Sequence, residues 1–117
     1  MNSTISIVAT PIGNLGDITE RALATLKAAD IILAEDTRNT GKLLNHFGIT
    51  TSVRSYHQHS SEREVNDILS LIADGQHLAL VTDAGTPGVS DPGNLLLDAV
   101  YQQYPETTIE TIPGASA

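Results

Sequence analysis

The chain has 117 residues, with 6 Lys and Arg against 14 Asp and Glu, and its formal net charge is -8 at pH 7. That length suits one ordinary domain. Apolar residues make up 40% of the chain, but the aromatic ones are three Tyr and one Phe, so we expect an aliphatic core. Because there is no Cys, disulfide scaffolds, zinc–cysteine sites and thiol catalysis are excluded from this chain.

The N-terminus indicates the location of the protein, and the charge balance indicates which partners it binds. The first four residues lack the basic segment and apolar run of a signal peptide, and no window approaches the roughly 20 apolar residues of a membrane span. We therefore expect a soluble, cytoplasmic protein. The negative charge argues against electrostatic binding of nucleic acid by the domain as a whole, since Lys and Arg are needed to displace phosphate counterions. Any RNA contact is expected to be local or to come from another domain.

Apolar runs of strand length alternate with helical periodicities along the whole chain. This pattern is typical of a parallel βαβ sheet. Strands are predicted over residues 5–9, 31–34, 52–56, 78–81 and 107–112. The third strand is the weakest of these predictions. The fold class is therefore three-layer α/β/α with a five-stranded, mainly parallel sheet.

Four helices are predicted between these strands, each from an apolar face and a start or stop signal. For the first, Asp17 and Glu20 form a capping-box-like pair. Gly48 is the expected stop of the second, and Gly75 of the third. Ser61 with Glu64 caps the third, and Asp91-Pro92 starts the fourth. The apolar faces, in chain order, are Ile18, Ala22, Leu26 and Ala29; Leu43, Leu44 and Phe47; Val65, Ile68, Leu69 and Ile72; and Leu95, Leu96, Ala99 and Val100.

Polar or Gly/Pro-rich segments follow four of the five strands. Parallel sheets bind ligands at the carboxyl ends of their strands, near a topological switch point. We therefore expect these segments to converge on one edge of the sheet. They are residues 10–14, 35–38, 83–88 and 113–117.

Each segment alone has an ordinary structural explanation beside the functional one. Asp83-Ala84-Gly85-Thr86-Pro87-Gly88 offers a carboxylate, a hydroxyl and exposed backbone to a polar cofactor, or it is a plain loop. It completes no phosphate- or dinucleotide-binding motif. Glu35, Asp36 and Arg38 suit substrate orientation, a magnesium ion or acid–base chemistry, or else an ion pair and a helix cap. His57 and His59 are more simply explained as solvated histidines than as metal ligands.

Taken together, the segments resemble the tetrapyrrole methylase family of S-adenosylmethionine-dependent methyltransferases. The resemblance runs from about Ser6 to the last residue. One departure is conservative, since Thr82 precedes Asp83 where the family usually has Ser. The matching stretches are Thr10-Pro11-Ile12-Gly13-Asn14-Leu15 with Asp17-Ile18-Thr19, Ala34-Glu35-Asp36-Thr37-Arg38, Asp83-Ala84-Gly85-Thr86-Pro87 with Ser90-Asp91-Pro92-Gly93, and Pro113-Gly114-Ala115-Ser116-Ala117.

The resemblance implies a two-domain protein with S-adenosylmethionine in the cleft between its domains. Residues 1–117 would then form the N-terminal domain, with the C-terminal domain absent from this chain and Ser116 standing as the N-cap of a following helix. A homodimer is expected, and no metal. The residues that the resemblance places against the cofactor are Pro11, Ile12, Gly13, Asp83, Gly85, Thr86, Pro87, Ser116 and Ala117.

Within the family, the motifs are most similar to those of the group that 2'-O-methylates a cytidine of 16S rRNA in the small ribosomal subunit. The reaction is an in-line attack of a ribose hydroxyl on a methyl sulfonium, so a protein must position two groups and accept a proton. Our hypothesis makes Glu35 or Asp36 the base and lets Arg38 place a phosphate. Arg38, Lys42 and Arg54 are candidates for a local basic patch, while the missing domain is expected to carry most RNA contacts.

Three other interpretations remain open at this stage. Relatives of the same fold methylate tetrapyrroles and protein side chains. A phosphoacceptor receiver module also has about five βα units, but its acidic pair follows the first strand and a Lys follows the fifth. Here the acidic pair follows the second strand, and no Lys occurs beyond Lys42. In the third interpretation, the chain has no activity of its own and serves as a dimerisation and folding unit.

Overall fold

The computed structural model describes residues 3–10, 15–56, 62–83 and 95–112, apart from the side chains of Leu15, Asp83 and Leu95. No helix among these residues is long and apolar enough to cross a membrane. In chain order, the elements are β1 (Thr4–Thr10), the short 3-10 helix η1 (Leu15–Asp17), α1 (Glu20–Ala28), β2 (Ile31–Ala34), α2 (Thr37–His46), β3 (Ser52–Ser55), α3 (Glu62–Ala73), β4 (His77–Asp83), α4 (Leu95–Gln103) and β5 (Thr108–Ile112).

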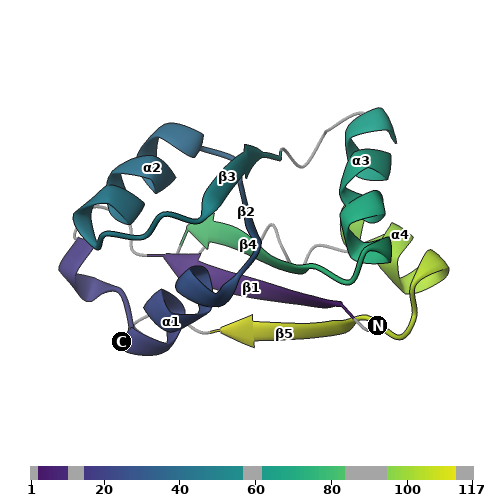
Figure 1. Cartoon of the computed structure of the whole chain (residues 1–117), viewed down its shortest axis with the longest axis horizontal. Coiled ribbons are helices and arrows are strands. Elements are labelled where there is room, and N and C mark those ends of the chain that lie inside the picture. Colours follow the sequence, from purple (N-terminus) through teal and green to yellow (C-terminus); the bar gives the residue numbers. More distant parts are fainter. Residues whose placement is uncertain (1–2, 11–14, 57–61, 84–94, 113–117) are drawn as a thin grey trace.

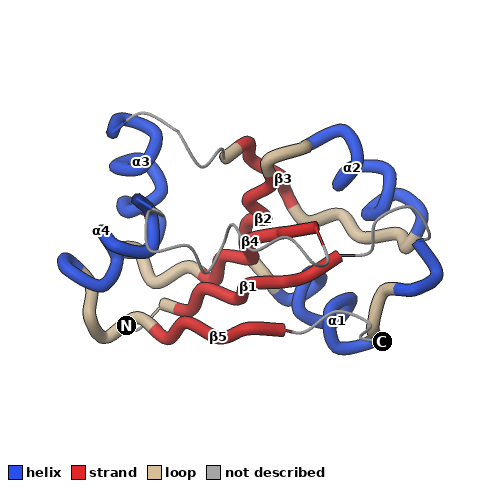
Figure 2. Tube along the Cα trace, turned by 180° about the vertical axis from the view of Figure 1, so that it is seen from behind, coloured by secondary structure: helices blue, strands red, loops and turns tan. Residues whose placement is uncertain are grey.

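The strands form one five-stranded sheet in the order β3-β2-β4-β1-β5, and all four strand pairs are parallel. Helices α1 and α2 pack on one face of the sheet and α3 and α4 on the other (Figures 1 and 2). The predicted three-layer α/β/α class is therefore confirmed. Parallel strands need such crossovers, and the covering helices bury both faces of the sheet.

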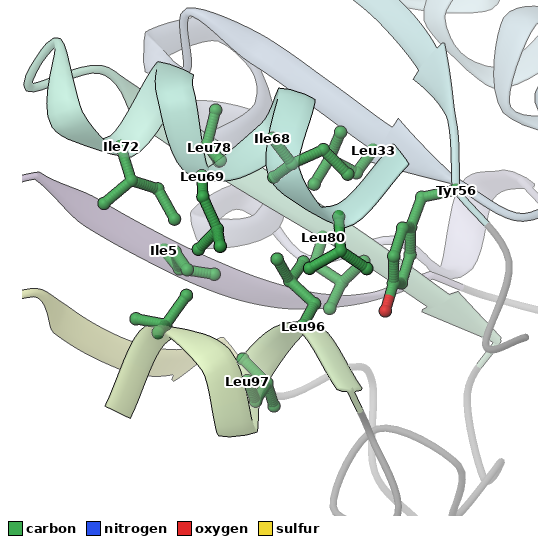
Figure 3. Close-up of a cluster of buried hydrophobic side chains, with 12 residues drawn as sticks. Ile5, Leu33, Tyr56, Ile68, Leu69, Ile72, Leu78, Leu80, Leu96 and Leu97 are labelled. Carbon is green, nitrogen blue, oxygen red and sulfur yellow. The ribbon is translucent and has the colours of Figure 1, made fainter. Parts of the chain in front are cut away.

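Two aliphatic layers hold the helices against the sheet, because successive strand residues point to opposite faces. In β2, Ile32 packs with α1 and α2, whereas Leu33 packs with α3 and α4, and both side chains are fully buried. Figure 3 shows the second of these layers, with Leu69 and Ile72 of α3 above the sheet. Among the buried hydrophobic residues that the structure describes, Tyr56 alone is aromatic, as the composition predicts.

The start of α1 corrects one prediction. Thr19, not Asp17, is the N-cap, and its side-chain oxygen accepts a hydrogen bond from the Ala22 backbone N–H at 3.1 Å. Asp17 lies in η1, outside the helix. The reason is one of position, because a cap must directly precede the first helical residue, here Glu20. The predicted apolar face is confirmed, since Ala22 and Leu26 are fully buried.

Both predicted glycine stops are confirmed by left-handed backbone angles. Gly48 follows α2 with φ of 67°, and Gly75 follows α3 with φ of 80°, a region that residues with a Cβ rarely adopt. The caps predicted at Ser61, Asp91 and Ser116 lie outside the described residues. Strands β1 and β4 extend further than their apolar runs, as far as Thr10 and Asp83, because they pair with each other over their whole length.

A partly buried polar cluster ties the edge strand β5 to the centre of the sheet. Ser6 of β1 is fully buried, and its Oγ donates to Glu110 Oε1 of β5 at 2.7 Å. The same oxygen lies 2.7 Å from His77 Nε2 of β4, so the imidazole N–H is the donor there. A buried hydroxyl without partners would cost about 1–3 kcal/mol, so this cluster makes Ser6 tolerable between apolar neighbours.

Candidate functional site

The carboxyl end of β4 is the topological switch point of the sheet. Its neighbours β1 and β2 both continue into helices on one face, α1 and α2, whereas β4 continues into α4 on the other face. Neighbouring chain segments therefore leave the sheet in opposite directions at this point. Open α/β sheets bind their ligands in the crevice that such a divergence creates.

The last residues of β1 and β4 lie side by side at this point. Thr10 pairs with Asp83, and the buried Thr10 Oγ1 donates a hydrogen bond to the Thr82 carbonyl oxygen at 3.1 Å. The segments that follow, which carry the residues predicted to contact a cofactor, thus start from adjacent points. Apart from the backbone of Asp83, those predicted residues lie outside the described part of the chain: Pro11, Ile12, Gly13, Gly85, Thr86, Pro87, Ser116 and Ala117.

The acidic pair after β2 flanks β4 on its other side. Ala34 pairs with Val81, so Glu35 and Asp36 follow β2 beside the end of β4. Asp36 is the N-cap of α2: its Oδ1 accepts from the backbone N–H groups of Arg38 and Asn39 at 3.1 Å each, and its Oδ2 accepts from Asn39 Nδ2 at 2.8 Å. The helix-cap explanation of Asp36 is therefore confirmed. Glu35 is exposed at the same edge.

The expected basic patch divides in two. Arg54 of β3 forms an exposed ion pair with Asp67 of α3, with 3.2 Å between Nη2 and Oδ2. Arg38 and Lys42 are exposed on α2 and take part in no ion pair with another described residue. Of the three candidate cations, Arg38 and Lys42 thus have no described ion-pair partner, whereas Arg54 has one.

Tyr56 lies at the same edge and is a residue that the sequence analysis did not single out. It directly follows β3, and Figure 3 shows its ring reaching past Leu80 toward Leu96 in the first turn of α4. Burial raises the pKa of Tyr56 above 10.0, and a hydrogen bond from the Leu96 backbone opposes the rise in pKa. A bond that favours the phenolate must donate to its oxygen, so the donor is the Leu96 N–H. The hydroxyl therefore caps α4 from another part of the chain.

The raised pKa of Tyr56 predicts a loss of stability in alkali. Because the folded protein holds this proton more tightly, the contribution of Tyr56 to the free energy of unfolding is fully present below the ordinary pKa of 10.0 and is lost as the pH rises above it. In Tyr56→Phe we expect a flatter alkaline limb in chemical unfolding followed from pH 8 to pH 11. Equal slopes for both proteins would contradict the assignment.

A metal site needs several ligating side chains close together. Among residues 3–10, 15–56, 62–83 and 95–112, no three His, Asp or Glu side chains gather as ligands. His57 and His59 lie outside these ranges. Thus the candidate site rests on the strand ends and on the residues around them.

Comparison with known proteins places this arrangement in a family. The profile described as Tetrapyrrole (Corrin/Porphyrin) Methylases matches residues 4–117. The chain belongs to this family. Family membership implies a methyl donor of the S-adenosylmethionine type. The polar residue types at the paired ends of β1 and β4, Thr10 and Asp83, are chemically compatible with such a group.

Two similar curated proteins share one name. The chain is 55% identical over 111 residues to the ribosomal RNA small subunit methyltransferase I of Synechocystis, covering 95% of this chain and 39% of that protein. It is 49% identical over 116 residues to the protein of that name from Streptococcus pyogenes serotype M3, covering 99% of this chain and 40% of the other. The chain thus spans well under half the length of these relatives.

Solved structures of more distant proteins share the fold. A cobalt precorrin-4 methyltransferase superposes with a TM-score of 0.70 at 21% identity, covering 97% of this chain and 46% of that one. The uroporphyrin-III-C-methyltransferase of Thermus thermophilus gives 0.69 at 18% identity, over 99% and 49%. The strand order 3-2-4-1-5 also differs from the 2-1-3-4-5 order of receiver-type folds, so the receiver interpretation was wrong.

Proposed function

We propose that this chain is the N-terminal half of an S-adenosylmethionine-dependent methyltransferase that 2'-O-methylates a cytidine of 16S rRNA in the small ribosomal subunit. The observation that carries the proposal is the 49–55% identity, over 95–99% of this chain, to proteins named ribosomal RNA small subunit methyltransferase I. The proposal includes a C-terminal domain that completes the cofactor cleft and carries most RNA contacts. The cytoplasmic location and the homodimer stay predictions.

The cofactor is proposed to bind at the end of β4. There Asp83, Gly85, Thr86 and Pro87 would contact it from one strand end and residues 11–13 from the next. Ser116 and Ala117 would contact it from the segment after β5. The pairing of Thr10 with Asp83 supports this assignment, since it starts two of the three segments at neighbouring points. The bound cofactor supplies an activated methyl group, and the protein holds the acceptor in line with it.

On the substrate side, we assign Glu35 as the group that accepts the ribose hydroxyl proton and Arg38 as the group that holds a phosphate. Asp36 is a weaker candidate for the base, because its two oxygens already accept three hydrogen bonds at the start of α2. Its proposed role is to position Arg38. No covalent intermediate is needed, because the hydroxyl attacks the methyl group directly.

A calorimetric titration of the full-length protein with S-adenosylhomocysteine tests the cofactor assignment. We expect Asp83→Ala to weaken binding about 10–100-fold, because a hydrogen bond to a charged group contributes about 1.5–3 kcal/mol. Asp74→Ala is the matched control, since Asp74 is exposed after α3, at the opposite edge of the sheet. Wild-type affinity in both variants would contradict the role of Asp83, and no binding to the wild-type protein would contradict the proposed function.

A further inference from the structure

The face of α2 that points away from the core has an unusual composition. Thr40, Leu43 and Leu44 are buried toward the sheet. At 100° per residue, Arg38, Lys42 and Asn45 lie opposite them, and all three are exposed. We call these three residues, together with Gly41 beside them, the outer face of α2. No Asp or Glu occurs anywhere in this helix.

Two of the exposed cations of this acidic domain, Arg38 and Lys42, lie on this face and form no ion pair with a described residue. The chain has a net charge of -8 and only 6 Lys and Arg. Arg54 is neutralised by Asp67, and Arg63 stands between Glu62 and Glu64 on α3. Arg38 and Lys42 are four residues apart on one helix, so their side chains are neighbours on the same surface. The pair therefore forms a local positive surface where the rest of the domain repels anions.

Gly41 adds a second observation on the same helix. A Cβ at this position would meet no atom within 4 Å, and the residue is not among the described glycines with positive φ. Packing and backbone conformation therefore give no reason for a glycine, which is a poorer helix former than alanine. A partner that approaches the helix backbone closely would give one.

The position of the helix indicates what the partner is. Asp36 caps α2 at the edge where β2 ends, so the outer face begins beside the candidate site and runs back from it for about 10 Å, at 1.5 Å per residue. We propose that the outer face of α2 binds the ribose–phosphate backbone of the substrate RNA, with Lys42 contacting a phosphate one helical turn beyond Arg38. This inference rests on the proposed function, and it places part of the RNA contact on this domain.

The test measures the binding of a 12-nucleotide single-stranded RNA to the full-length protein as a function of salt concentration. Each phosphate contact contributes about 0.7 to the slope of log affinity against log salt for a single strand. We expect Lys42→Gln to lower the slope by about that amount. Arg63→Gln removes the same charge from the exposed surface of α3 and is expected to leave the slope unchanged. Equal slopes for the two variants would overturn the inference.

Gly41→Ala provides a test that leaves the charge unchanged. Alanine favours the helix, so we expect the thermal midpoint of the free protein to rise while RNA affinity falls several-fold. Unchanged RNA affinity together with a higher thermal midpoint would overturn the close approach of the RNA to the helix backbone at Gly41. The same variants are titrated with S-adenosylhomocysteine, which is expected to bind them like the wild-type protein. The titration tests the proposed function, whereas the salt slopes test the RNA-binding surface. The two results are independent, because the slopes can be measured whether or not the cofactor binds.

Discussion

Glu35→Gln is expected to lower the single-turnover rate of rRNA methylation by the full-length enzyme about 10²–10⁴-fold, the usual contribution of a general base. The amide keeps the size of the side chain but cannot accept the ribose proton. Because the proposed role is confined to the chemical step, binding of S-adenosylhomocysteine should stay within about twofold of wild type. The measurement is a rapid-quench assay with enzyme in excess over unmethylated small ribosomal subunits.

Asp36 provides the matched control for Glu35. Serine caps helices about as well as aspartate, so Asp36→Ser should keep most of the rate if Asp36 only starts α2. Asp36→Ala should lower the stability by about 0.5–2 kcal/mol through loss of the cap. If Asp36→Ser loses more rate than Glu35→Gln, the assignment of the base is reversed. If both variants keep the wild-type rate, neither carboxylate is the base.

Leu78→Ala is expected to lower the free energy of unfolding by about 2–5 kcal/mol, a large part of the roughly 5–15 kcal/mol that stabilises a domain. Leu78 is fully buried in the central strand β4, where it pairs with Ile5 on one side and Ile31 on the other. Figure 3 shows it between the sheet and α3. Truncation removes apolar contacts and leaves a cavity that strands paired on both sides cannot close easily. Urea unfolding measures the loss as a lower midpoint.

Tyr101→Ala is the control for Leu78→Ala, because Tyr101 of α4 is 61% exposed although it is larger than Leu78. We expect its effect to stay within about 0.5 kcal/mol. A similar loss in both variants would mean that burial in the sheet does not dominate the stability. It would point instead to a partner that covers Tyr101.

The elements themselves were predictable because their signals are local. The apolar spacing of Val65, Ile68, Leu69 and Ile72 predicts α3, and these four residues are the ones buried. The continuous run over residues 31–34 predicts a strand buried on both faces, and β2 has those bounds. Local signals fail where two caps compete, as with Asp17 and Thr19. They also miss polar strand ends such as Thr10, whose place in the sheet depends on a partner strand.

For the candidate site, the sequence predicts which segments meet at the carboxyl edge but not how they are arranged there. The sequence allowed either a catalytic role or a helix cap for Asp36. Its three hydrogen bonds to residues of α2 show that it is the cap. Arg54 does not belong to the basic patch, because it forms a hydrogen bond with Asp67, 13 residues away in the chain. The residues expected to contact the cofactor remain predictions, since nearly all of them lie outside the described residues.

The sequence by itself determined the element types, the aliphatic core and the family motifs, because burial periodicity, capping and motif spacing act over a few residues. Only the tertiary structure decided the strand order β3-β2-β4-β1-β5 and, with it, the switch point at the end of β4. It also decided the contacts of Ser6 with His77 and Glu110, which are 71 and 104 residues away in the chain. Such contacts depend on which strands become neighbours, and that choice is made by the packing of the whole sheet and its helices.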